Sequence, residues 1–242
     1  MSQLFSFRTM AWIGFFGLII WAWWVMYDMA MMMGRMPMNM HDLGPLFVMW
    51  AIMMAAMMGP TFVPTLRTYE DMITSANGTR AGWFGLIAGY LGVWIGFAAI
   101  IALVQVQLIE ARLVTRMGRS MSGVFSAALL LAAGFYQFTA LKERCLRHCR
   151  SPMLQFLAHW RSGGWGGVIM GAHHGAYCVL CCWGLMVIGF VGGTMDLLWM
   201  GGATVLMTLE KIEEAGRWLT RPLGLALIVW GGYVAAQTAG LL

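Results

Sequence analysis

The segment "AHHGAYCVLCCW", residues 172–183, holds the densest group of side chains that could bind a metal ion. With 3.6 residues per turn, each residue advances about 100° around a helix axis. Four potential ligands therefore share one face: His174, Cys178, Cys181 and Cys182. Neutral imidazole and thiolate are ligands that suit Cu(I) or Zn(II). The alternative interpretation is a core histidine beside cysteines that act only as small apolar side chains.

Two further features of this segment argue against haem. Trp183 follows Cys182, so the segment lacks the CxxCH motif of covalent haem attachment. A haem between two helices needs axial ligands from both, but the only histidines within a predicted span are the adjacent pair His173 and His174. His173 also points to the side of the helix that bears Tyr177. We therefore expect no haem.

The segment "LKERCLRHCRSP", residues 141–152, forms a second candidate group from Cys145, His148 and Cys149. The two cysteines are four residues apart, so they are neighbours on a helix. Thiolates in a reducing compartment often bind metals. The alternative interpretation is a basic membrane anchor that contains two incidental cysteines.

A methionine-rich stretch precedes the second apolar run. Eight of the sixteen residues in "MYDMAMMMGRMPMNMH", residues 26–41, are methionine. Thioether sulfur is a soft ligand that favours Cu(I), so the stretch predicts a copper capture site that continues inward along the next helix. Its members would be Met29, Met33, Met36, Met38, Met40, Met49 and Met53. The alternative role of these residues is flexible filling of apolar interfaces.

The composition indicates that transmembrane helices position these residues. Of the 242 residues, 60% are hydrophobic and 10% are charged, and the mean hydropathy is +0.73. A spanning helix needs about 20 apolar residues. The sequence therefore predicts one all-α polytopic bundle over residues 1–242, with a Met-rich outer segment at 29–43 and a Cys- and His-containing inner loop at 142–165. We expect about seven spans, near residues 9–28, 44–66, 83–109, 121–141, 166–191, 194–210 and 222–241.

Prolines and glycines predict local features of these spans. Pro60 and Pro64 should kink or unwind the far end of the second span, because proline removes a backbone donor. Glycines permit close approach of helices. They are frequent in the third and fifth spans, at Gly85, Gly89, Gly92, Gly96, Gly166, Gly167, Gly171 and Gly175.

Four motifs in this order resemble a bacterial family of predicted metal-binding integral membrane proteins that is largely uncharacterised. The motifs are "AIMMAAMMGP" (51–60), "GFYQFTALKERCLRHCRSP" (134–152), "HHGAYCVLCCWGLM" (173–186) and "LEKIEEAGRW" (209–218). The resemblance implies a polytopic helical protein that binds metal, with no assigned reaction. By position it points to Cys145, His148, Cys149, His174, Cys178, Cys181, Cys182 and Glu210. For Glu210 we expect a charge pair with Lys211 or Arg217, and the alternative role is to accept a hydrogen bond from a ligand histidine.

The sequence favours handling or delivery of a soft metal in the bacterial inner membrane. Copper is the favoured ion, and zinc is the second choice. The alternative is a metal-containing or scaffold subunit of a membrane oxidoreductase complex, so whether the protein is an enzyme stays open. Expected partners are the lipid bilayer and other membrane subunits. No phosphate-binding loop or nucleophile motif is visible, and the net charge of +5 does not imply nucleic acid.

We expect a cytoplasmic N-terminus, because positively charged loops stay inside. With this orientation the inner segments hold eleven of the Lys and Arg residues and the outer segments hold four. A single cysteine placed at Asn39 in a cysteine-free background should then react with an impermeant thiol reagent on intact cells. Protection of that cysteine until lysis would reverse the orientation.

Overall fold

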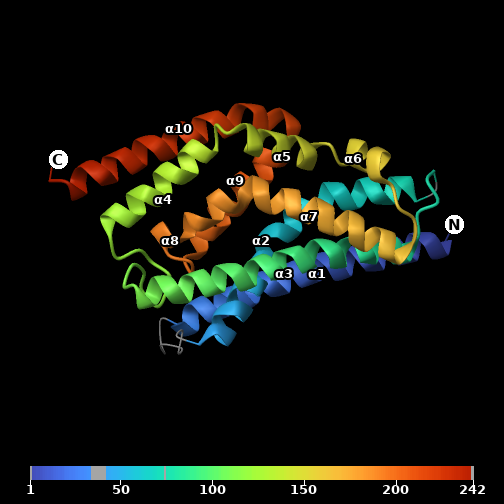
Figure 1. Ribbon diagram of the computed structural model, residues 1–242. Coiled ribbons are helices and arrows are strands. Elements are labelled where there is room, and N and C mark those ends of the chain that lie inside the picture. The colour runs from blue at the N-terminus through green and yellow to red at the C-terminus, as the bar shows by residue number, and fades with distance from the viewer. Residues whose placement is uncertain (1, 34–41, 74, 241–242) are drawn as a thin grey trace.

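The structure is a computed structural model that describes residues 2–33, 42–73 and 75–240 (Figure 1). In these residues every regular element is an α-helix, which confirms the predicted all-α class, and one isolated β-bridge joins Val114 to Ser120. The helices are α1 (Ser2–Met33), α2 (Leu43–Met72), α3 (Arg80–Glu110), α4 (Gly123–Tyr136), α5 (Ala140–Arg150), α6 (Pro152–His159), α7 (Gly163–Val187), α8 (Gly189–Gly192), α9 (Leu197–Lys211) and α10 (Glu213–Thr238).

Five described stretches are helical, long and apolar enough to cross a membrane: Arg8–Met32, Leu43–Met72, Arg80–Glu110, Gly163–Gly192 and Glu213–Thr238. A sixth span results if α4 and α5, which are bent by 64° relative to each other, count together. The expected span at 194–210 is instead α9, a helix of 15 residues. At about 1.5 Å per residue such a helix is shorter than the hydrocarbon core, so helix length supports fewer spans than the expected seven.

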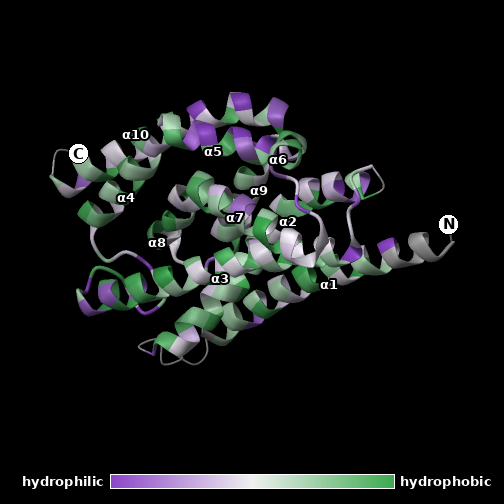
Figure 2. Cartoon of the chain, turned by 45° about the vertical axis from the view of Figure 1, so that its right-hand side comes forward, coloured by the Kyte–Doolittle hydropathy of each residue, from purple (hydrophilic) through white to green (hydrophobic). Residues whose placement is uncertain are grey.

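The surface of the bundle carries many apolar side chains. Leu198, Trp218 and Trp165 are 89%, 84% and 75% exposed. Figure 2 shows hydrophobic residues over most of α1 and α3, whereas hydrophilic residues gather on α5 and the neighbouring part of α10. Soluble monomers rarely expose large contiguous apolar patches. This surface is of the kind that lipid covers.

The interior depends on an unusually close contact between α3 and α7, which lie side by side in Figure 1. A Cβ atom added at Gly85 or Gly89 of α3 would clash with a backbone carbonyl of α7, and one added at Gly167 or Gly171 of α7 would clash with a carbonyl of α3. These four glycines confirm the predicted close approach.

The other glycines of the expected set divide in two. Gly175 also faces α3, since its added Cβ would lie 3.1 Å from the Cβ of Val93. Gly92 and Gly96 have no atom within 4 Å of their Cβ positions, so the prediction was wrong for them: no neighbouring helix approaches α3 closely at these two positions. An added Cβ at Gly166 would meet Arg161 of its own connecting segment instead of another helix.

The two prolines of α2 do not unwind it, because α2 stays helical to Met72. The alternative expectation, a kink at these prolines, stays a prediction. Pro60 has no N–H to donate to the carbonyl of Ala56, four residues earlier. The indole nitrogen of Trp23 on α1 donates to that carbonyl at 3.1 Å. A neighbouring helix thus replaces the missing hydrogen bond, which is how membrane helices tolerate proline.

Substitution of Gly89 tests the contact between α3 and α7. Gly89→Ala should destabilise the protein by about 1–3 kcal/mol, the usual cost of overpacking, because the added methyl group meets the carbonyl of Val168. Gly92→Ala on the same helix is the matched control and should be neutral or slightly stabilising, since its Cβ position is open. Thermal unfolding in detergent measures both variants, and equal melting temperatures would contradict the close contact.

Candidate metal centre

Three cysteines of α7 form the core of the candidate site. The sulfur atoms of Cys178, Cys181 and Cys182 all lie within 4.8 Å of one another. The residues are 0%, 2% and 2% exposed, so the thiols are sealed from solvent. Helical spacing of three and four residues places them on one side of α7. That side faces the interior of the bundle, as the sequence pattern predicted.

A fourth thiol comes from α5. The sulfur of Cys149 lies 3.9 Å from the sulfur of Cys181, although the two residues are 32 positions apart in the chain. Cys145 is buried one turn earlier on α5, and both α5 cysteines are free thiols. We call Cys149, Cys178, Cys181 and Cys182 the thiol centre.

A buried ion pair holds α5 in this position. The ammonium group of Lys142 on α5 donates to Glu210 on α9 at 2.8 Å, and both side chains are at most 2% exposed. The guanidinium Nε of Arg150 also donates to the backbone carbonyl of Glu210 at 2.8 Å. The sequence analysis expected Glu210 to pair with Lys211 or Arg217, and the structure pairs it with Lys142. Lys142 precedes Glu210 by 68 residues in the sequence, so no local spacing indicates that the two side chains pair.

The second helix, α2, adds a thioether. The sulfur of Met58 lies 3.9 Å from the sulfur of Cys182, and Met58 is completely buried. Five sulfur atoms from α2, α5 and α7 therefore gather in one apolar interior. Thiolate and thioether together form a soft ligand set.

A lysine ammonium completes the surroundings of the thiol centre. Lys211, the last residue of α9, places its Nζ 2.9 Å from the sulfur of Cys178 and 2.8 Å from the hydroxyl of Thr61, to which it donates. The hydroxyl of Tyr90 lies 3.1 Å from the same sulfur. In a low-dielectric interior, a positive charge at this distance interacts strongly with the electron-rich sulfur of Cys178.

His174 lies on the same inward face of α7 as the cysteines and is 1% exposed. Its two ring nitrogens contact other groups: Nδ1 lies 2.8 Å from Oε1 of Gln155, and Nε2 lies 3.2 Å from Oγ1 of Thr65. These hydrogen bonds satisfy the polar ring inside the bundle. In this arrangement His174 acts as a bridge between α7, α6 and α2.

His148 is separated from the cysteines on either side of it in the sequence. Its ring stacks on Tyr177 with centroids 3.9 Å apart, and the ring of His173 lies 5.3 Å away. The ring of His159 lies 5.3 Å from that of His173. The structure thus separates the predicted ligands of this segment. Cys149 belongs to the thiol centre, whereas His148 lies outside it with the rings of Tyr177 and His173.

The predicted methionine path is partly described. Met49 and Met53 of α2 are 2% and 3% exposed and face the interior. Met29 of α1 is partly buried and packs against the core. The side chain of Met33 and the residues Met36, Met38 and Met40 lie outside the described part of the chain.

The sequence analysis missed the groups that surround the thiols. Met58 belongs to the methionine-rich motif of α2, but its spacing does not single it out from its neighbours. Lys211 carries a detectable signal, because a lysine at the end of an apolar helix needs a partner. Tyr90 and Thr61 carry none, since both residue types are common in membrane helices.

Replacement of Lys211 tests its electrostatic role. Lys211→Gln removes the charge and should weaken binding of a soft monovalent ion by about 10–100-fold, the usual effect of losing an outer-sphere partner. Lys211→Arg keeps the charge and should retain much of the affinity. Competition with a chromophoric Cu(I) chelator measures both variants. Wild-type affinity in the Gln variant would show that the ammonium does not support the thiolates.

Comparisons with known proteins bear on these residues. Searches of curated proteins and of solved structures gave no match. The model of a family described as PpoB2, copper chaperone, matches residues 47–234, which include the thiol centre, Met58 and Lys211. The match covers most of the chain, so this protein belongs to the PpoB2 copper chaperone family.

Proposed function

We propose that this protein is a membrane-embedded chaperone that holds Cu(I) at the thiol centre and passes it to an acceptor protein. The observation that carries the proposal is the meeting of four buried thiols, from α5 and α7, beside the ammonium of Lys211. Soft thiolates select Cu(I). The family supports copper as the ion.

The balance of charge favours Cu(I) over Zn(II). Two thiolates around Cu(I) carry a net charge of −1, which the single ammonium of Lys211 neutralises. A tetrahedral Zn(II) site of four thiolates would carry −2 and leave one negative charge uncompensated next to this lysine. An uncompensated buried charge is expensive.

The surplus of sulfur ligands favours delivery over permanent retention. Cu(I) accepts low coordination numbers, and the centre offers four thiols with the thioether of Met58 beside Cys182. An ion held by a subset of these ligands can move between them by forming one bond as it breaks another. A fixed metal centre of an oxidoreductase subunit would instead use every ligand in one closed arrangement.

The exposed apolar surface supports a location in the membrane. Five described helices are apolar enough to span it, and the hydrophilic residues gather on α5 and the neighbouring part of α10 (Figure 2). We place the protein in the bacterial inner membrane with a cytoplasmic N-terminus. The thiol centre lies near the middle of α2 and α7, and its cysteines are free thiols.

Anaerobic loading of the purified protein with Cu(I) tests this function. Wild type should bind Cu(I) with high affinity and release it to a competing thiol ligand on a time scale of minutes. Cys178→Ser should weaken binding by more than the about 10–100-fold effect of losing an outer-sphere partner, because it replaces the central soft ligand with a hard one.

Cys145→Ser is the matched control, since it changes a buried cysteine one turn outside the thiol centre. It should keep most of the affinity, which chelator competition and elemental analysis of the bound metal will show. Equal affinities of Cys178→Ser and wild type would contradict the site. Copper that survives prolonged exposure to chelator would favour the fixed centre of an oxidoreductase subunit.

A further inference from the structure

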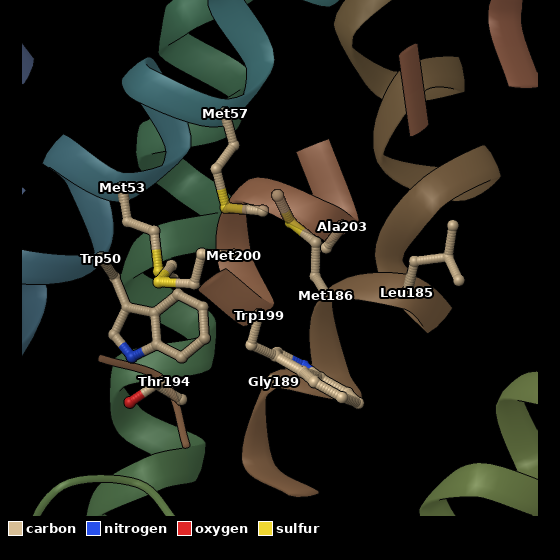
Figure 3. A pocket seen from close by; sticks show the side chains of 10 residues that line it. All are labelled: Trp50, Met53, Met57, Leu185, Met186, Gly189, Thr194, Trp199, Met200 and Ala203. Atoms are coloured by element: carbon tan, nitrogen blue, oxygen red, sulfur yellow. The ribbon is translucent and has the colours of Figure 1, made fainter. Parts of the chain in front are cut away.

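A second group of sulfur atoms lies next to the thiol centre. Figure 3 shows the side chains of Met53 and Met57 from α2, Met186 from α7 and Met200 from α9 around one small cavity. These methionines are between 3% and 6% exposed. Three helices that are distant in the sequence therefore direct four thioethers to the same place.

The cavity has the size of a single ion. Its volume of about 20 Å³ exceeds the roughly 10–15 Å³ that one water-sized body requires. Methionine that serves only as flexible filler adapts its shape to close such gaps. Here the four side chains surround a space instead of filling it.

Two polar groups in the lining, the indole N–H of Trp50 and the hydroxyl of Thr194, are engaged elsewhere. The indole N–H of Trp50 donates to Oε1 of Gln105 at 2.7 Å, and the hydroxyl of Thr194 donates to the carbonyl of Met117 at 3.1 Å. A bound water needs two to four polar partners, so the cavity suits water poorly. Sulfur lone pairs and the aromatic faces of Trp50 and Trp199 remain as the groups that can attract a guest. Both interact with a soft, weakly hydrated cation.

The cavity adjoins the thiol centre along two helices. Met186 follows Cys182 by four residues, which is slightly more than one turn or about 6 Å along α7. Met57 directly precedes Met58, whose sulfur lies 3.9 Å from that of Cys182. On both α2 and α7, a methionine of the cavity is therefore next to, or one turn from, a sulfur-bearing residue at the thiol centre.

We propose that Met53, Met57, Met186 and Met200 form a second site, which binds Cu(I) more weakly than the thiol centre and feeds it. The proposal rests on the proposed function, because it assigns to the thiol centre the role of copper acceptor. Thioethers are neutral, so they hold Cu(I) less tightly than thiolates do. The ion therefore moves from the four methionines to the cysteines with a gain in affinity and without any change of oxidation state.

Silver binding tests the second site, since Ag(I) shares the ligand preference of Cu(I) and does not undergo redox cycling. The four methionines are changed together to leucine, which nearly conserves side-chain volume. The matched control changes four other buried methionines to leucine: Met26, Met72, Met170 and Met207. Both sets are made in the full chain with all five cysteines replaced by serine, and bound Ag(I) is counted by elemental analysis.

We expect the control variant, which keeps the four cavity methionines, to bind one more Ag(I) ion per chain than the variant in which those methionines are leucine. Equal silver content in the two sets would overturn the second site. Should the cysteine-free chain fail to fold, the same two sets in the chain with intact cysteines decide the question through the rate at which the thiol centre takes up Cu(I). The cavity set should load at least several-fold more slowly, and equal rates would again overturn the proposal.

The two proposals fail in distinguishable ways. The final affinity of the thiol centre depends on the cysteines, so it should be the same in the cavity set and in the control set. A loss of that affinity in Cys178→Ser concerns the proposed function. A loss of silver content or loading rate in the cavity set concerns the second site.

Discussion

The carboxylate of Glu210 connects the parts of the molecule that build the thiol centre. This carboxylate accepts a hydrogen bond from Lys142, and the backbone carbonyl of Glu210 accepts one from Arg150. A charge in this interior is tolerated only when it is paired, so α5 must lie against the end of α9. That contact brings Cys149 to Cys181. The next residue of α9, Lys211, reaches Cys178, so one ion pair aligns both the fourth thiol and the neutralising charge.

The sequence predicted the local part of this arrangement. The inward stripe of cysteines on α7 follows from helical periodicity alone, because residues three and four apart share a face whatever surrounds the helix. The burial of Met49 and Met53 follows from the same rule applied to α2. The glycines of the close contact were among those named from the sequence, but which of them would meet a carbonyl of the other helix was not predictable. The stretch over which α3 and α7 stay close is decided by the packing of whole helices.

The non-local part could not be read from spacing. His148 lies between Cys145 and Cys149 in the sequence, and a helix turns it about 100° away from the latter, toward Tyr177. The contact of Cys149 with Cys181 depends on the 64° bend between α4 and α5. His174 shares the face of the cysteines, yet Gln155 and Thr65 on other helices take both of its ring nitrogens. Each outcome depends on groups that meet only after the bundle has assembled.

The hydrogen bond from Trp23 to the carbonyl of Ala56 has a consequence for how the bundle assembles. The exposed helix α1 buries little surface, so apolar packing alone would leave it free to rotate or slide along its neighbour. A carbonyl deprived of its donor by Pro60 offers a strong polar contact at one position along α2. A second anchor near the opposite end of α1 joins Trp12 to Glu70 at 2.8 Å. Two tryptophans, 11 residues apart, thus set the register of α1 against α2, together with the ion pair between Arg8 and Glu70 at 3.1 Å.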